Sequence, residues 1–226
     1  MTFTEGSVKK NYYVHLKGSV VKLNYGILDV EMTCDGKKRN GKFVDDDRMK
    51  HHHREVISVG FVVVDKKYNI KAKYSSFIKP VHSPCLTQYC QELTGISQYN
   101  VDNGKKCNDA FRDIFFLCQK FNIKFILTFG NCDKMGLSTS MRWIKKKNKH
   151  EKVWAIGAIA KMLIDVQPAI VKSIYPKGIK YLPGLKKIAD KMELMSKKAN
   201  HNALNDAILL ASVCCNAKIY VCNISP

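Results

Sequence analysis

Three strand-like stretches in the first third of the chain constrain the fold more than any other feature. The stretch Val56–Val64 reads Val-Ile-Ser-Val-Gly-Phe-Val-Val-Val, and this density of β-branched residues is typical of a strand. Strands are also predicted over Tyr25–Thr33 and Lys73–Ile78, with a turn at residues 66–69 before the last of them. Three strands in succession predict an antiparallel meander at the start of a mixed sheet.

A helical pattern follows the predicted meander. Apolar residues recur at helical spacing from Cys107 to Phe121, and strand character returns over Lys124–Phe129. The remaining elements predicted are a helix within residues 131–149, helices over Ala155–Met162, Leu185–Met192 and Ala203–Val213, and a short strand at Leu163–Val166. Asn200 or Asn202 is the expected cap of the last helix. This order predicts a three-layer α/β domain around a mixed sheet.

The composition predicts a single domain that binds a polyanion. The 226 residues are 46% hydrophobic and show no compositional break, so we expect a single domain over residues 1–226. Lys and Arg number 38 against 19 Asp and Glu, a net charge of +19. Such an excess favours RNA or DNA as a partner, although solubility alone would also account for it.

The sequence also indicates a compartment. No stretch approaches the ~18 apolar residues of a membrane helix, and the first residues lack an apolar run of signal-peptide length. We therefore expect a soluble, intracellular, cytoplasmic protein with no membrane partner. The nine cysteines are scattered without a CxxC pair, so we expect reduced and mostly buried thiols.

A pair of acids stands out on the first predicted strand. Asp29 and Glu31 are two residues apart, so their side chains point to the same face, although their immediate neighbours are apolar. Two carboxylates side by side repel each other, and a hard divalent cation such as Mg²⁺ or Mn²⁺ is the usual compensation. The alternative is an exposed strand face on which both acids meet water.

Two further positions carry chemistry later in the chain. Asp133 follows the predicted strand Lys124–Phe129, at the kind of strand-to-helix junction where sites gather in α/β sheets, although it could simply cap a helix. His201 precedes the predicted helix Ala203–Val213, and Asp206 lies in its first turns. A histidine titrates near neutrality and can take a proton from water, although a single loop histidine can also be incidental.

In this order the motifs resemble the DEDDh exonuclease superfamily, over Leu23 to Val213. The segment Leu28-Asp-Val-Glu-Met-Thr-Cys34 is similar to the Asp-Phe-Glu-Ala-Thr-Cys signature of the Eri-type and KapD-like branch, which acts on RNA. Further matches are Glu55–Gly60, Glu92–Ile96, Phe129–Asp133 and Leu182–Leu185.

The resemblance implies an RNase-H-like fold with a catalytic core over about residues 22–215. It implies a 3′→5′ exonuclease that hydrolyses single-stranded RNA or DNA from the 3′ end to nucleoside 5′-monophosphates, with RNA favoured. Two Mg²⁺ or Mn²⁺ ions are implied, held by Asp29, Glu31, Asp133 and Asp206, with His201 as the general base.

By the same resemblance, two segments contact the terminal base and sugar. These substrate-binding residues are Met32, Thr33, Leu93, Thr94, Gly95 and Ile96. Met32 stands where the family usually has a smaller residue. Asp165, which also has apolar neighbours, is interpreted as structural because the family pattern assigns the third metal-binding aspartate to Asp133.

Two other features depart from the family pattern or lie outside it. The segment Asp35–Arg54 is longer than usual and contains Asp45–Asp47 and His51–His53, which we interpret as parts of a mobile surface loop and not as a metal site. The basic run Arg142–Lys152, with Lys37–Arg39, is a candidate guide for phosphates, or else a solvated face. Two alternatives stay open: a catalytically silent nucleic-acid-binding module, and a zinc protein that uses the histidines and cysteines. The sequence does not reveal protein partners or the oligomeric state.

Overall fold

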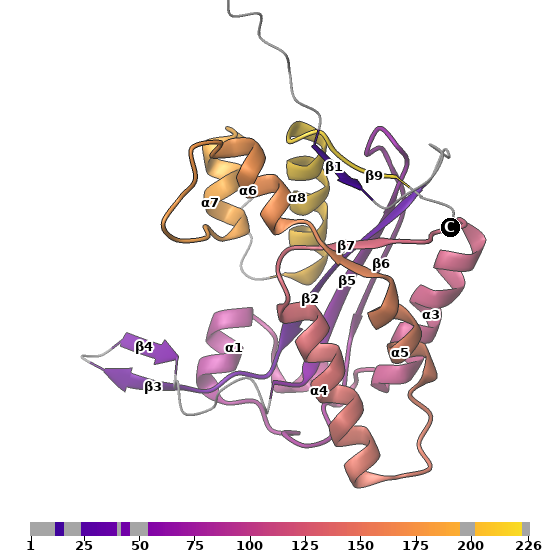
Figure 1. Ribbon diagram of the computed structural model, residues 1–226. Coiled ribbons are helices and arrows are strands. Elements are labelled where there is room, and N and C mark those ends of the chain that lie inside the picture. The colour runs from indigo at the N-terminus through magenta and orange to yellow at the C-terminus, as the bar shows by residue number, and fades with distance from the viewer. Residues whose placement is uncertain (1–11, 16–23, 40–41, 46–53, 195–201, 223–226) are drawn as a thin grey trace, which may run out of the picture.

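A five-stranded mixed sheet forms the centre of the molecule (Figure 1). The computed structural model describes residues 12–15, 24–39, 42–45, 54–194 and 202–222. In spatial order the strands are β6 (Ile70–Phe77), β5 (Val56–Val64), β2 (Tyr25–Met32), β7 (Ile126–Thr128) and β8 (Leu163–Asp165). The β6–β5 and β5–β2 pairs are antiparallel, whereas the β2–β7 and β7–β8 pairs are parallel. The predicted meander is therefore confirmed as three of the five strands of this sheet.

Burial along the strands follows their place in the sheet. Every residue of β5 is buried, because this strand lies between two others and is covered on both faces. On the edge strand β6, exposed residues alternate with partly buried ones. β6 begins at Ile70, three residues before the predicted start at Lys73.

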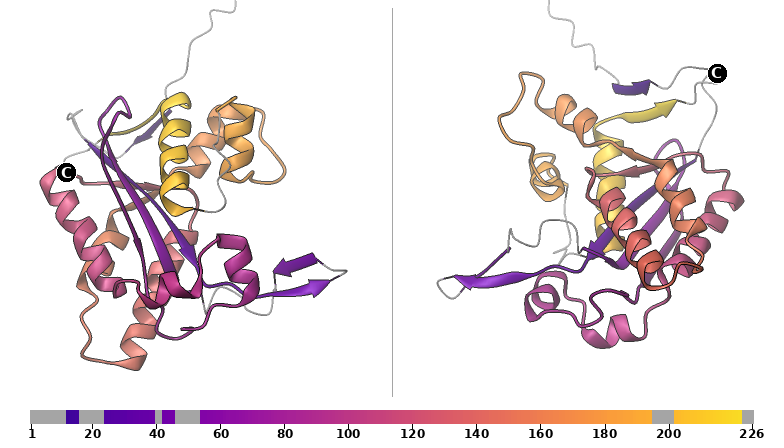
Figure 2. Two further views of the ribbon diagram at one scale, coloured as in Figure 1. Left: turned by 180° about the vertical axis from the view of Figure 1, so that it is seen from behind. Right: turned by 60° about the horizontal axis from the view of Figure 1, so that its bottom comes forward.

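Helices cover both faces of the sheet and complete three layers (Figures 1 and 2). One layer holds α3 (Cys107–Lys120), α4 (Cys132–Lys147) and α5 (Trp154–Met162), and the other holds α6 (Gln167–Ile174), α7 (Leu185–Lys191) and α8 (Ala203–Asn216). The odd-numbered side chains Tyr25 and Ile27 of β2 pack toward α8, whereas Leu28 and Val30 pack toward α3 and α5. The predicted three-layer α/β architecture is confirmed.

Two short helices close the end of the sheet at which β2 terminates. α1 (Gln88–Thr94) begins at the cap Thr87, whose side chain accepts the amide of Cys90, and ends at Gly95 with φ of 69°. α2 (Gln98–Asp102) follows. The sequence did not predict α1, α2 or α6.

The interpretation of Asp35–Arg54 as a loop is wrong in part. Within it, β3 (Gly36–Arg39) and β4 (Lys42–Asp45) pair as an antiparallel hairpin, and this hairpin projects from the body of the molecule (Figure 2). Residues 46–53, which include most of the acidic and all of the histidine triplet, lie outside the described residues. A second small pair joins β1 (Tyr12–His15) in parallel to β9 (Ile219–Cys222).

Two expectations from composition can be compared with the structure. The eight cysteines whose side chains the structure describes are free, but only four of them are buried, so the expectation of mostly buried thiols is wrong in part. Within the described ranges, no helix has the length and apolar character that crossing a membrane requires.

Candidate active site

Strand β2 carries two acids toward the layer that contains α8. Asp29 lies opposite Gly60 of β5, and Glu31 lies opposite Ser58, so both continue the face that begins with Tyr25 and Ile27. The ladder shifts register between Glu31 and Met32, the last residue of β2. Asp29 and Glu31 therefore lie near the end of β2, and pairing with β5 fixes their positions.

The first turn of α8 adds a third carboxylate. Asn202 caps this helix by accepting the amide of Asn205, which confirms one of the two predicted caps and starts the helix three residues before Asp206. One carboxylate oxygen from each of Asp29, Glu31 and Asp206 lies within 4.8 Å of the others. Residues far apart in the sequence therefore form one acidic cluster that could hold a metal ion.

Close approach between α8 and the sheet depends on a glycine. A Cβ atom on Gly60 would lie 2.2 Å from the backbone of Ala203 and Leu204, at the start of α8. Because β5 has no side chain at this position, the helix backbone rests directly on the strand. This contact allows the Asp206 carboxylate to lie close to that of Asp29.

Asp133 lies next to the cluster, in the first turn of α4. Its side chain is only 4% exposed, and its Oδ1 atom accepts the amide of Val30, 3.0 Å away, between the two acids of β2. The alternative interpretation of Asp133 as a helix cap is wrong, because Asn131 is the N-cap residue and the Asp133 carboxylate binds β2 instead. Asp133 is not one of the three acids within 4.8 Å, but its charge acts on them.

Burial and neighbouring negative charge raise the pKa of Asp29, Glu31 and Asp133. Burial raises the pKa of Asp29 well above its usual range, and the charges of Asp133, Glu31 and Asp206 raise it further. Burial, followed by Asp206 and Asp133, raises the pKa of Glu31 to about 8. Burial raises the pKa of Asp133 to about 7, although the amide of Val30 opposes this shift. Full ionisation of the cluster is thus unfavourable without a cation, and a divalent cation is the natural counter-charge.

Asp165 holds the loop that leads to Asp133. Its Oδ1 atom accepts the amides of Gly130, 2.8 Å away, and Gln167, 2.9 Å away. Gly130 adopts a φ of 86°, a conformation that favours glycine. The carboxylate of Asp165 is engaged by backbone amides, as expected of the structural residue that the sequence indicated.

The segments predicted to contact substrate lie beside the cluster but differ in exposure. Thr33 is buried, and its Oγ1 atom accepts the amide of Glu55. Thr94 and Ile96 are also buried, whereas Leu93 and Gly95 are exposed. Met32 packs against α4, because a Cβ on Gly136 would lie 2.6 Å from its sulfur. Contact between any of these residues and a substrate stays a prediction.

Glu55 is a buried acid whose role the sequence did not reveal. It is 1% exposed, and its two carboxylate oxygens accept the amides of Val81, His82 and Ser83 at 2.8–2.9 Å. This residue fixes the loop after β6 against the start of β5. The segment Glu55–Gly60 is part of the family resemblance, but nothing in the spacing of one isolated acid indicates three amide donors.

Some predicted residues cannot be placed. His201 lies outside the described residues, as does His51–His53. For Lys37–Arg39 only the backbone of β3 is described. The role of His201 as general base therefore stays a prediction.

Together, the mixed three-layer fold and an acidic cluster at the end of its central strand define a nuclease-like protein of the RNase-H type. The sequence model of the RNase_T family, described as "Exonuclease", matches residues 27–214, and the chain belongs to this family. The predicted resemblance to DEDDh exonucleases of the Eri type is thereby confirmed at the level of the family.

Relatives and solved structures agree with this assignment. Human ERI1 exoribonuclease 2 is 32% identical over 106 residues, covering 44% of this chain and 14% of that protein. Human ERI1 exoribonuclease 3 is 25% identical over 166 residues, covering 64% and 45%. The chain thus spans less than half the length of these curated relatives. The solved nuclease domain of 3′hExo, a DEDDh family member bound to rAMP, has 18% identity and a TM-score of 0.65, covering 86% of this chain and 90% of that one.

Proposed function

We propose that this chain is a metal-dependent 3′→5′ exonuclease that shortens single-stranded nucleic acid, with RNA preferred over DNA. The observation that carries this proposal is the meeting of Asp29, Glu31 and Asp206 within 4.8 Å at the end of a buried strand. The family match supports the reaction class, and the names of the exoribonuclease relatives support RNA as the substrate. The proposed products are nucleoside 5′-monophosphates.

The acidic cluster fits hard divalent cations. Its donors are all carboxylate oxygens, which suit Mg²⁺ or Mn²⁺, and burial together with their mutual repulsion already raises the pKa of Asp29 and Glu31. We propose that Asp29, Glu31 and Asp206, together with Asp133, hold two such ions. When bound, the ions supply an activated water and neutralise charge on the leaving 3′ oxygen.

The protein's own contribution is position and proton transfer. The ladder of β2 with β5 fixes Asp29 and Glu31, and the amide of Val30 fixes Asp133. We propose that His201 accepts the proton of the attacking water, because imidazole is half-protonated near neutral pH. Its place one residue before the cap of α8 keeps it near Asp206 in the chain.

Two segments flank the cluster on the proposed substrate side. We propose that the exposed Leu93 and Gly95 meet the terminal base and sugar, while the buried Thr94 and Ile96 hold α1 and its C-terminal turn in place. Met32 and Thr33 complete this wall from the end of β2. Gly95, with its positive φ, leaves room for backbone to approach the sugar.

The test is a time course on matched, 5′-labelled single-stranded RNA and DNA with Mn²⁺, Mg²⁺ or EDTA. We expect a metal-dependent ladder that shortens from the 3′ end, faster on RNA. Asp29→Asn and His201→Ala should each lower kcat/KM by roughly a hundredfold or more. Asp190→Asn is the matched control, because Asp190 is exposed on α7 and is not one of the clustered acids.

Other outcomes identify other functions. Tight binding of RNA without shortening would leave a catalytically silent binding module. Faster cleavage of DNA would overturn the RNA preference but keep the reaction. Activity that requires zinc and ignores Mg²⁺ and Mn²⁺ would contradict the proposed cation site.

A further inference from the structure

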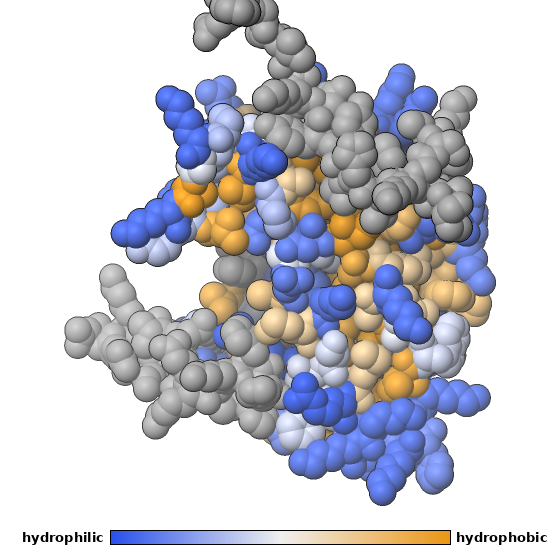
Figure 3. All heavy atoms as spheres, viewed as in Figure 1, coloured by the Kyte–Doolittle hydropathy of each residue, from blue (hydrophilic) through white to orange (hydrophobic). Residues whose placement is uncertain are grey.

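The end of α4 remote from Asp133 carries a dense basic surface. In the stretch Arg142–Lys152, Glu151 is the only acid, and the other charged side chains are Lys and Arg. Figure 3 shows hydrophilic side chains gathered at the lower end of the molecule, where Figure 1 places the end of α4. No part of the acidic cluster lies here.

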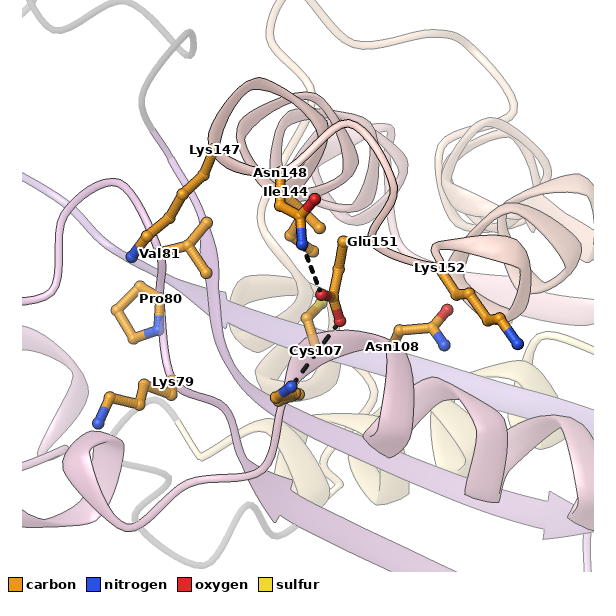
Figure 4. A pocket seen from close by; sticks show the side chains of 11 residues that line it. Lys79, Pro80, Val81, Cys107, Asn108, Ile144, Lys147, Asn148, Glu151 and Lys152 are labelled. Carbon is orange, nitrogen blue, oxygen red and sulfur yellow. Dashed lines mark hydrogen bonds and ion pairs between the residues drawn. The ribbon is translucent and has the colours of Figure 1, made fainter.

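Lysines from separate segments surround a pocket of about 310 Å³ on this surface (Figure 4). They are Lys79, Lys106, Lys147 and Lys152. The one acid of the pocket, Glu151, is engaged by Lys106 at 3.9 Å and by the Asn148 amide at 3.4 Å. Within the described part of the chain, Lys79, Lys147 and Lys152 form no ion pair with an acid. The pocket therefore presents uncompensated positive charge.

Two neighbouring depressions extend this pocket. One shares Val81 and Lys147 with it and adds Trp143 and Lys146. The other shares Lys106 and Lys152 and adds Asp109, Arg112, His150 and Trp154, with Arg112 and Asp109 joined in an ion pair at 3.1 Å. We call the three together the basic trough. Both tryptophans of the chain lie along it, and Trp154 is 46% exposed.

The trough is held in shape by contacts between residues that are not part of the acidic cluster. The ring of His82 stacks on Trp143 with centroids 3.4 Å apart and planes 3° apart, and the Lys146 Nζ atom lies 4.6 Å from the Trp143 centroid. Glu55 fixes the loop of His82 through three amides. These contacts join the 81–83 loop to α4, so the lysines on either side are presented on a fixed frame, which lowers the entropy lost on binding.

The length of α4 sets the distance between the trough and the cluster. Asp133 lies in the first turn of this helix and Lys147 is its last residue, so a rise of 1.5 Å per residue separates them by about 21 Å. A stacked strand advances about 3.4 Å per nucleotide, so roughly six nucleotides span this distance.

We propose that the basic trough binds phosphates of the substrate strand upstream of the 3′ end held at the acidic cluster. The inference rests on the proposed function and adds to it a second, remote contact. Lys79, Lys147 and Lys152, which pair with no acid among the described residues, lie near the half-exposed ring of Trp154. This combination of cations and an aromatic ring is the kind that binds single-stranded nucleic acid. The consequence is a dependence on substrate length: strands shorter than roughly six nucleotides reach the cluster but not the trough.

The test compares two triple variants of the full chain. The trough variant is Lys79→Gln, Lys147→Gln and Lys152→Gln. The control is Lys66→Gln, Lys67→Gln and Lys73→Gln, which removes the same charge from exposed positions near the β5–β6 turn. That turn contacts Cys215 at the end of α8 opposite to Asp206.

Binding is measured in EDTA by fluorescence anisotropy, with single-stranded RNA of about 25 nucleotides over a series of salt concentrations. The trough variant should bind about tenfold more weakly. The slope of the logarithm of the association constant against the logarithm of the salt concentration should become less steep by about 2, because each of the three lost phosphate contacts on a single strand contributes about 0.7. The control should change the affinity less than about twofold. In Mn²⁺, the trough variant should cut the long RNA at least about tenfold more slowly and an RNA of about five nucleotides at the wild-type rate.

Each contrary result is informative. Equal losses in both triple variants would overturn the trough and leave a non-specific effect of charge. A membrane surface would be the partner of the trough under two results together. Vesicles rich in phosphatidylserine would displace RNA from the wild type, and the trough variant would bind these vesicles poorly but bind RNA as the wild type does. If the wild type cuts both RNAs and the trough variant does so equally, the proposed function stands and the trough proposal fails. If the wild type binds long RNA through the trough but cuts nothing, the trough stands and the exonuclease proposal fails.

Discussion

At the scale of single residues, the acidic cluster opposes the stability of the fold that builds it. Asp29 and Glu31 lie on a strand whose other side chains on that face are buried and apolar, and Asp206 and Asp133 add charge from two helices. Buried like charges are unfavourable unless they are protonated or compensated. The chain thus holds an acidic cluster whose charge a divalent cation would compensate.

This opposition predicts how stability depends on pH when no divalent cation is present. Because the pKa of Glu31 rises from 4.5 to about 8 in the folded chain, the folded state keeps a proton that the unfolded chain releases. The contribution of Glu31 to the free energy of unfolding is therefore most favourable below about pH 4.5 and falls as the pH rises to about 8. In EDTA above about pH 8, Glu31→Gln should be more stable than wild type by on the order of 2 kcal/mol, and the two should converge near pH 4.5.

Urea denaturation at a series of pH values measures this difference. The exposed Glu193→Gln is the matched control and should follow the wild type at every pH. Added Mn²⁺ should stabilise the wild type more than Glu31→Gln. A Glu31→Gln protein that is less stable than wild type in EDTA at high pH would contradict the assignment of repulsion to this cluster.

The residues of the site were predictable to different degrees. The spacing of Asp29 and Glu31 placed both on one face of a strand, because the strand period of two depends on local geometry alone. The roles of Asp133 and Glu55 depend on amides of Val30 and of the 81–83 loop, which lie far away in the sequence. A local sequence pattern carries no information on such long-range contacts. For this reason the sequence allows Asp133 to be a helix cap and indicates no role for the Glu55 side chain.

At the scale of elements, the site depends on how closely α8 approaches β5. Gly60→Ala would place a Cβ atom 2.2 Å from the backbone at Ala203 and Leu204, and backbone cannot yield as a flexible side chain does. We expect a loss of stability of about 1–3 kcal/mol and weaker binding of Mn²⁺, because Asp206 moves with the helix.

The same substitution elsewhere provides a control of opposite sign. Gly157 lies inside α5, where an added Cβ meets only the Met141 sulfur, 3.8 Å away. Gly157→Ala should stabilise the chain by about 0.5–1 kcal/mol and leave Mn²⁺ binding unchanged. Urea denaturation and a Mn²⁺ titration check both variants. Wild-type stability and cation binding in Gly60→Ala would show that α8 does not need this contact.

Element prediction succeeded where the pattern was long and failed where elements were short. β5 and α3 carry sustained strand and helix patterns, and both were predicted. α1 and α2 have seven and five residues, too few for a helical period to emerge, and their capping depends on Thr87 and Ser97. The β3–β4 hairpin lies in a polar segment with little apolar alternation, so its pairing was not foreseen.

At the scale of the whole molecule, the three layers bring distant segments to one place. β2, α4 and α8 converge where Asp29, Glu31, Asp133 and Asp206 meet, and α4 then carries the chain away to the basic trough (Figure 1). The order of strands and helices predicted the layers, because apolar periodicity specifies which faces are covered. The trough was only partly foreseen, since Lys79 and Lys106 join the predicted basic run through the fold alone.

The central claim is that the acidic cluster is the cation site of an exonuclease, and direct binding of Mn²⁺ tests it most simply. Electron paramagnetic resonance of free Mn²⁺ would be recorded during titration of wild type, Asp29→Asn and Asp190→Asn at about pH 8, the pKa to which burial and neighbouring acids raise Glu31. The account predicts saturable binding by wild type and Asp190→Asn, and a loss of affinity of roughly a hundredfold in Asp29→Asn. Unchanged binding in Asp29→Asn would contradict the account, because the bound cation would then lie elsewhere on the protein.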